Sequence, residues 1–379
     1  MDNAKPMPDT IEEWLAGPVL LPEVELDMPF PPCWSSDPLP ALRQRYVDWL
    51  RKFGLITTED QAKGYLRHCI AELSVLSYPE AKGARLDMGY DLISITVLFS
   101  DFFDTTSLGQ DPSQVARAIR ELVRLTLEPP GTEPGVSAHP AVWAFADAWG
   151  RETEGMSPAW QARASANWRA WFSTWLIEAS NRFSGHLPST SEYVSHRRES
   201  AAIGAYRDSF ESANQCECPS AILDSAQMRI AFEAYGECIG LVNDIYSSNV
   251  ESSRKDVHNM VTVLEGNQGL SREAAIAETA RKSNQAVARM QHLTQSLSPL
   301  YDAYQLSIRE REAADRFLAG LGHTLRANLE FSRRSARYET SLLLGDGSYS
   351  YLTETPSLLA QAQDGNNEMH PFQTESTGT

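Results

Sequence analysis

The sequence contains little of what marks a zinc protein, an exported protein or a membrane protein. Its 5 cysteines are scattered along 379 residues without a CxxC pair or a His/Cys cluster, so no zinc site and no disulfide framework is expected. The N-terminus, MDNAKPMPDTIEEWL, lacks the apolar core of a signal peptide, and no apolar run approaches about 18 residues. We therefore expect a cytoplasmic protein with reduced thiols and no membrane span.

Basic residues are also scarce. Lys and Arg total 33 against 50 Asp and Glu, which gives a formal net charge of −17. This balance argues against nucleic acid or an anionic membrane as the main partner, because both are bound through basic patches. An anionic substrate would need a local cationic pocket or bound metal ions.

Alternating strand patterns and internal repeats are absent as well, whereas helical spacing of apolar residues recurs along the chain. With 42% hydrophobic residues the chain can bury a large core, and we expect one large all-α domain. The segments expected to be helical are 41–53, 60–78, 88–104, 112–127, 140–151, 158–183, 190–208, 220–248, 254–265, 271–297 and 299–340.

The two ends of the chain differ in composition from this helical domain, which we place at residues 41–342. Residues 1–40 are rich in proline and are expected to form an extended arm that packs on the domain. Residues 343–379 are rich in Gly, Ser, Thr, Asn and Gln, and we expect a disordered tail with room for a short ordered stretch near Tyr349–Leu352. Trp168, Trp171 and Trp175 share one helix face and are expected to pack in the core.

A stripe of oxygen-bearing side chains follows the apolar stretch AFEAYGECIGLV. Asn243, Ser247 and Glu251 are spaced four residues apart, so on a helix they span only about 80° of arc. Amide, hydroxyl and carboxylate oxygens on one rigid stripe suit Mg²⁺, which prefers oxygen ligands. A polar helix face in solvent is the alternative interpretation.

An acidic pair follows the mostly apolar LISITVLFS. Asp101 and Asp104 lie three residues apart, about 60° from one another on a helix, and could bind cations together. Carboxylates that face a pocket repel each other unless metal ions neutralise them. The alternative is a helix end that reaches solvent.

Two clusters of arginine stand out in this acidic chain. One contains Arg197 and Arg198, and the other ends in the pair Arg337-Tyr338. The planar guanidinium group suits bidentate contacts with phosphate. Surface ion pairs with neighbouring glutamates are the alternative for both clusters.

The order of these features along a helical chain resembles the class I terpene synthases, in the single-α-domain form of fungi and bacteria. The resemblance runs from about Trp49 to Tyr338. The metal motif of that family, NDxxSxxxE, is complete here at Asn243, Asp244, Ser247 and Glu251. The family's diphosphate-sensing arginine lies 46 residues before the motif's Asn, which is Arg197 here, and its terminal Arg-Tyr pair matches Arg337 and Tyr338.

The chain departs from the family in its acidic motif, which is commonly DDxxD or DDxxE. The five positions fall on residues 100–104, so Ser100 replaces the first aspartate, often the chief metal ligand. An alternative register begins at Asp101 and shortens the motif by one residue. We expect metal contact through Asp101 or Asp104. The basic residue that often precedes the triad Glu is Val250 here, and the glycine expected after the sensor arginine is replaced by Ala201-Ala202.

The resemblance implies a helical bundle around a central apolar active-site cavity. It also implies ionisation of a prenyl diphosphate, with farnesyl diphosphate favoured, and cyclisation to a terpene hydrocarbon or alcohol. Three Mg²⁺ ions are expected, for which Mn²⁺ could substitute. The metal ligands that it implies are Asp101, Asp104, Asn243, Ser247 and Glu251.

The same resemblance assigns the remaining site residues. Arg197, Arg337 and Tyr338 are expected to bind the diphosphate and to stabilise it as it leaves. Phe99, Phe103 and Phe331 are candidates for the aromatic wall, where a cation–π contact contributes about 0.5–2 kcal/mol.

Three other functional classes compete with this interpretation. A chain-elongating prenyltransferase would carry a second aspartate-rich motif, and a class II cyclase would carry DxDD, neither of which is present. The missing first aspartate leaves a catalytically weak or inactive homologue that binds diphosphates or a partner protein. We expect a monomer or a homodimer.

Overall fold

The computed structural model describes residues 7–19, 24–345 and 348–352. These residues are built from helices and connecting segments, and the one β-type pairing among them is an isolated antiparallel bridge between Leu343 and Tyr349. The expected all-α fold is therefore confirmed. None of the helices in the described ranges has the length and hydropathy that a membrane span needs.

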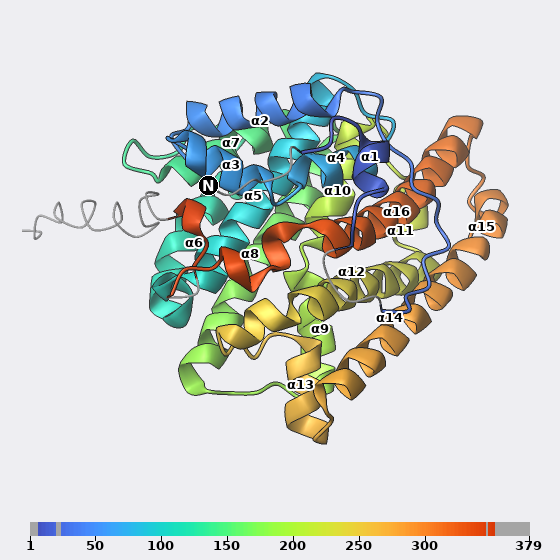
Figure 1. Ribbon diagram of the computed structural model, residues 1–379. Helices are drawn as coiled ribbons and strands as arrows, with labels where there is room; N and C mark the ends of the chain where they lie inside the picture. Colours follow the sequence, from blue (N-terminus) through green and yellow to red (C-terminus); the bar gives the residue numbers. More distant parts are fainter. Residues whose placement is uncertain (1–6, 20–23, 346–347, 353–379) are drawn as a thin grey trace, which may run out of the picture.

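Figure 1 shows the helices, whose bounds are as follows. They are α1 (Ile11–Leu15), α2 (Leu39–Lys52), α3 (Glu59–Leu66), α4 (Ile70–Ser77), α5 (Ala84–Thr105), α6 (Pro112–Leu127), α7 (Pro140–Thr153), α8 (Pro158–Ser184), α9 (Thr190–Ser200), α10 (Ile203–Ala213), α11 (Ser220–Leu223), α12 (Ala226–Ser253), α13 (Met260–Gln268), α14 (Arg272–Gln295), α15 (Ser298–Ala303) and α16 (Ile308–Arg334). Short 3₁₀ helices are η1 (Ser107–Gln110), η2 (Ala336–Tyr338), η3 (Thr340–Leu342) and η4 (Ser350–Leu352).

Four segments expected as single helices are each interrupted. The interrupted segments are 60–78, 190–208, 220–248 and 299–340. Cys69 and Ala202 adopt left-handed backbone conformations, each with φ of 57°. At each of them the chain changes direction, and the next helix begins at the following residue. Ser225 and Ser307 instead start new helices as N-caps, because their side chains accept hydrogen bonds from the backbone N–H groups of the first turn.

Long helices form the body of the molecule. The central helix α12 packs against α14, which runs along the outer edge of the bundle in Figure 1, and against α16. Helix α5 packs against α4, α7 and α10, and α8 packs against α6, α9 and α10. This arrangement surrounds the interior with α5, α8, α12 and α16, which come from distant parts of the sequence.

Aromatic side chains fill much of the core. Trp168, Trp171 and Trp175 of α8 are each at most 3% exposed, which confirms their predicted burial. The Trp168 indole donates to Glu152 at 3.0 Å, so its polar edge is satisfied in the interior.

The N-terminal arm packs on this body as expected, but it is not extended throughout. Residues 11–15 form α1, and Arg334 Nη2 donates to the Leu15 carbonyl at 2.7 Å. Further along, the Ser35 N–H donates to the Val75 carbonyl at 3.0 Å and the Ser35 hydroxyl donates to the Ala81 carbonyl at 2.9 Å.

The chain continues to pack on the bundle beyond residue 342, where the helical domain was expected to end. Tyr349, Tyr351 and Leu352 are buried against the bundle, within the short stretch that the sequence analysis set apart as ordered. Residues 353–379 of the expected tail lie outside the described residues.

Candidate active site

One cavity is lined mainly by α5, α8, α9, α12, α16 and η2, and it brings together motifs that are far apart in the sequence. The sequence-predicted site residues that line it are Asp104, Arg197, Asn243, Ser247, Glu251, Phe331, Arg337 and Tyr338. The other three, Phe99, Asp101 and Phe103, are fully buried outside this lining.

The predicted oxygen stripe faces this cavity from α12. Asn243 Oδ1 accepts a hydrogen bond from Arg197 Nη2 at 2.7 Å, and Asn243 Nδ2 donates to Tyr338 Oη at 2.7 Å. Ser247 and Glu251 lie further along the same face, and both accept from Asn259 Nδ2, at 3.3 and 2.7 Å. The stripe, the sensor arginine and the terminal tyrosine therefore form one connected group.

Glu251 lies where its charged form is disfavoured. Burial, with the neighbouring carboxylates of Asp244 and Asp256, raises the pKa of Glu251 to about 7. Arg197 and Asn259 only partly offset this effect. A carboxyl group held this way favours a nearby cation.

Asp244 is the second residue of the NDxxSxxxE motif. It does not line the cavity but holds Arg197. It is fully buried and accepts from Arg197 Nε at 2.9 Å, from Tyr193 Oη at 2.6 Å and from the Met260 N–H at 3.0 Å. These contacts fix the Arg197 guanidinium so that its Nη2 atom reaches Asn243. The adjacent Arg198 points elsewhere and pairs with glutamates of α12.

The acidic motif divides between two environments. Ser100 and Asp104 line the cavity, which is the facing expected of the five-residue register. Asp101 is fully buried, and its carboxylate accepts from Arg337 Nη2 at 2.6 Å and from Tyr351 Oη. Asp101 thus lies outside the cavity lining and holds Arg337, whereas Asp104 lines the cavity, and the expectation that metal contact comes through Asp101 or Asp104 stays a prediction.

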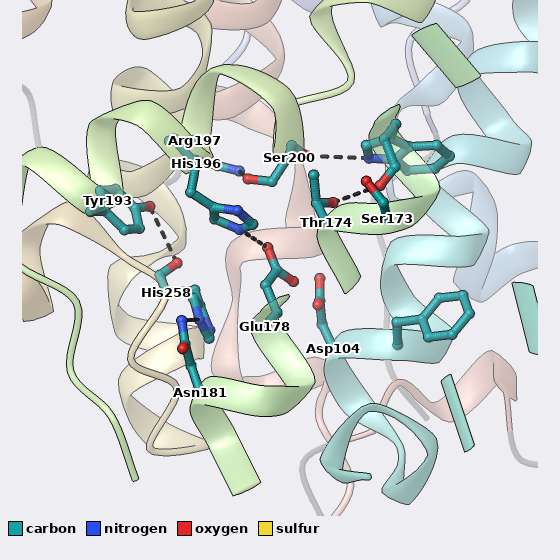
Figure 2. Close-up of polar contacts among 12 residues, drawn as sticks. Asp104, Ser173, Thr174, Glu178, Asn181, Tyr193, His196, Arg197, Ser200 and His258 are labelled. Atoms are coloured by element: carbon teal, nitrogen blue, oxygen red, sulfur yellow. Dashed lines mark hydrogen bonds and ion pairs between the residues drawn. The ribbon is translucent and has the colours of Figure 1, made fainter. Parts of the chain in front are cut away.

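Asp104 belongs to an ion-pair cluster that the sequence analysis did not find. Arg182 Nη2 lies 3.1 Å from Asp104 Oδ1, 2.8 Å from Asp256 Oδ2 and 3.6 Å from a Glu178 oxygen. Figure 2 shows Glu178 between Asp104 and His196, whose Nε2 atom lies 2.9 Å from Glu178 Oε1. Burial and the nearby Glu178 raise the pKa of Asp104 to about 6.

The aromatic wall differs from the expected one. Phe103 stacks on Trp175 with ring centroids 4.0 Å apart, and Phe99 meets the same indole edge-on at 5.9 Å. Both phenylalanines therefore lie behind Trp175, whereas Trp171, Trp175 and Phe331 line the cavity. The tryptophan pattern was visible in the sequence, but helical spacing alone does not distinguish a core face from a cavity wall.

Comparison with known proteins bears on this geometry. A sequence model of the family described as Terpene synthase family 2, C-terminal metal binding, matches residues 91–289. A pentalenene synthase of Streptomyces avermitilis is 33% identical over 342 residues, which cover 89% of this chain and 99% of that protein. The chain belongs to the class I terpene synthase family.

Other similar proteins are also named as terpene synthases. A (-)-beta-caryophyllene synthase of Saccharothrix espanaensis, named as cyclising (2E,6E)-farnesyl diphosphate, is 29% identical over 86% of this chain and 91% of that protein. The crystal structure of an α-eudesmol synthase superposes with a TM-score of 0.73 at 25% identity, over 82% of this chain and 99% of that one. Wild-type cucumene synthase gives a TM-score of 0.70 at 26% identity, over 81% and 99%.

One further arginine at the cavity of this terpene synthase was not predicted from the sequence. Arg254, three residues after Glu251, lines the cavity, and its buried Nε and Nη1 atoms have no hydrogen-bond partner within the described part of the chain. The same holds for Nε of Arg337. Buried donors without acceptors are costly, so these atoms suit an anionic ligand. The position of Arg254 just after the metal motif was the available signal.

The donors in this terpene synthase also suit a metal ion that shares its coordination with a phosphate. No set of three His, Cys, Asp or Glu side chains within the described ranges is placed to bind a metal by itself. The triad offers one carboxylate and two neutral oxygens, and Mg²⁺ typically combines few protein ligands with water and phosphate oxygens. The raised pKa of Glu251 supports the fit, because a divalent ion would supply the missing positive charge.

Proposed function

We propose that this protein ionises farnesyl diphosphate in the presence of Mg²⁺ and cyclises the resulting cation to a terpene hydrocarbon or alcohol, with release of diphosphate. The observation that carries the proposal is the meeting of the oxygen stripe of α12, four arginines and a tryptophan-lined wall at one cavity. Farnesyl diphosphate is favoured because the (-)-beta-caryophyllene synthase, which matches most of this chain, is named as cyclising it.

The oxygen stripe would hold metal ions at the cavity mouth. Asn243, Ser247 and Glu251 supply one set of oxygen ligands, and Asp104 supplies a carboxylate from the facing helix α5. Bound Mg²⁺, or Mn²⁺ in its place, would supply positive charge that neutralises the leaving diphosphate. We keep the expected three ions as part of this proposal.

The arginines and Tyr338 would bind the diphosphate directly. Arg197 is held by Asp244, Arg337 is held by Asp101, and Arg254 brings unpartnered nitrogen atoms to the same cavity. Donors fixed before the substrate binds stabilise negative charge as it develops, without reorganising at that moment.

The indole rings would guide the carbocation. Trp171 and Trp175 present large aromatic surfaces to the cavity, with Phe331 as a third ring. Such rings stabilise a cation by about 0.5–2 kcal/mol each without offering it a nucleophile. Phe99 and Phe103 support Trp175 from behind.

The test is incubation of the purified protein with Mg²⁺ and, separately, geranyl, farnesyl and geranylgeranyl diphosphate, followed by mass spectrometry of volatile products. We expect a terpene product from farnesyl diphosphate. Glu251→Gln should reduce turnover by about 100-fold or more. The matched control is Glu265→Gln, which removes a carboxylate of α13 that pairs with Arg272 away from the cavity.

Absence of product with all three substrates would contradict the proposal and favour the inactive homologue. The expected monomer or homodimer and the cytoplasmic location stay predictions.

A further inference from the structure

The segment just beyond the terminal Arg-Tyr pair reaches back into the site. We propose that Tyr351 is a positioning residue for diphosphate binding, acting by holding Asp101, which in turn aims the guanidinium of Arg337 into the cavity. The inference rests on the proposed function, and it adds a residue that lies beyond all of the family motifs recognised in the sequence.

The chain of contacts is direct. Tyr351 Oη donates to Asp101 Oδ2, and Arg337 Nη2 donates to Asp101 Oδ1 at 2.6 Å. Asp101 has no exposed surface, so these two partners fix its carboxylate away from water. Burial and the adjacent Asp101 raise the pKa of Tyr351 well above its ordinary value, which keeps the phenol protonated as the donor.

The segment that carries Tyr351 is seated independently of any substrate. The Tyr351 ring meets Tyr65 edge-on at 5.0 Å and His68 at 5.2 Å, and Gln61 Nε2 donates to the Tyr351 carbonyl at 3.2 Å. Two residues earlier, Tyr349 Oη donates to the Arg337 carbonyl at 2.8 Å. Arg337 is thus held through its backbone by one tyrosine and through its side chain, by way of Asp101, by the other.

This support matters because an arginine binds phosphate through a planar fork that must be oriented. A free arginine side chain loses rotamer entropy when it is immobilised, whereas one already fixed by a buried carboxylate does not. Nε of Arg337 has no partner in the described residues and the side chain lines the cavity, so the held group still has a donor to offer. Loss of the Tyr351 hydroxyl would leave Asp101 buried with one partner and free to turn.

The first experiment measures the affinity of the full-length protein for inorganic diphosphate at saturating Mg²⁺ by calorimetry. We expect Tyr351→Phe to weaken binding about tenfold, the effect of losing one hydrogen bond to a charged group. The matched control is Tyr301→Phe. Its hydroxyl also donates to an aspartate, Asp315, at 2.9 Å, but neither residue lines the cavity. The control should bind diphosphate like the parent.

A double-mutant cycle separates positioning from general support of the fold. If Tyr351 acts through Arg337, Tyr351→Phe has little further effect on diphosphate affinity in an Arg337→Gln background. An equal loss in both backgrounds, or no loss in the single variant, overturns the inference. Turnover of the parent is measured in parallel. Diphosphate binding without a terpene product contradicts the cyclase proposal alone, and a parent that binds no diphosphate overturns both.

Discussion

Ser100 stands where the family's acidic motif commonly has its first aspartate, and it lines the cavity together with Asp104. A hydroxyl there provides one unit less negative charge than an aspartate. Asp104 already pairs with Arg182, so the negative charge that α5 contributes to the cavity is largely neutralised. The α12 stripe would then contribute most of the protein's metal affinity.

Ser100→Asp should therefore lower the Mg²⁺ concentration needed for half-maximal turnover, by about tenfold if the new charge is worth one unit of cation attraction at a partly buried site. A Mg²⁺ titration of turnover measures this. Ser100→Asn is the control, since asparagine has nearly the size of aspartate but no charge. It should leave the midpoint of the Mg²⁺ titration unchanged. An unchanged midpoint in Ser100→Asp would mean that this position does not face the metal.

Adjacent residues in this part of the chain have different partners. Arg197 lies at the cavity with Asp244 and Asn243, whereas Arg198 pairs with Glu233 and Glu237 of α12. The spacing to the metal motif predicts Arg197 as the diphosphate-sensing arginine, and Arg197 is the one of the pair that donates to Asn243. Asp101 and Asp104 divide in the same way, but there the sequence left the choice open.

At the scale of elements, the junction between α3 and α4 connects the core to the C-terminal segment. His68 lies in this junction, 1% exposed, and its ring meets Tyr349 and Tyr351 edge-on. Burial lowers the pKa of His68 to about 4, with Arg337 and Arg67 adding to the effect and Asp101 opposing it. The folded protein thus keeps this imidazole neutral.

This predicts an acid-sensitive contribution to stability. Because the folded pKa of His68 is depressed, its contribution is complete above the ordinary value of about 6.5 and is lost as the pH falls towards 4. His68→Phe should remove this loss, so the melting temperature of the variant should fall less than that of the parent between pH 7 and pH 4. Circular dichroism melts at several pH values measure it.

The control for that comparison is His186→Phe, which changes an exposed histidine of the α8–α9 connection. It should follow the pH dependence of the parent. Parallel curves for the parent and His68→Phe would show that the buried imidazole does not couple to folding in this range.

At the scale of the whole molecule, the net charge of −17 opposes the binding of an anion. The arginines at the cavity are largely matched by their own carboxylates, such as Asp244 with Arg197 and Asp101 with Arg337. The site therefore supplies oriented donors rather than a large excess of positive charge. Diphosphate binding should consequently depend on divalent cations.

Melting curves should show this dependence directly. Mg²⁺ and diphosphate together should raise the melting temperature by about 3 °C, the stabilisation expected when a ligand is present at about 100 times its dissociation constant. Either one alone should raise it much less. Glu251→Gln should lose the joint effect, and Glu265→Gln should keep it. A full rise with diphosphate in excess EDTA would contradict the dependence on metal.

Much of the fold and part of the site could be predicted from local pattern. Helical periodicity indicated the long helices, and the spacing of Asn243, Ser247 and Glu251 placed three oxygens on one face of α12. Breaks such as Ala202 were missed because alanine ordinarily continues a helix, and only the packing around it imposes the left-handed conformation. Arg254 and Arg182 were missed because no spacing rule distinguishes an arginine at a cavity from one in solvent.

The sequence by itself determined the all-α class, the oxygen stripe and the pairing of Arg197 with the metal motif, since each depends on contacts within one helix or on a fixed family spacing. Only the tertiary structure decided that Asp101 holds an arginine, that Trp171 and Trp175 rather than Phe99 and Phe103 line the cavity, and that Tyr351 contacts Asp101. The physical reason is common to all three. Which side of a buried helix faces a cavity depends on the elements that pack against it, and those elements are brought there from hundreds of residues away by the burial of apolar surface.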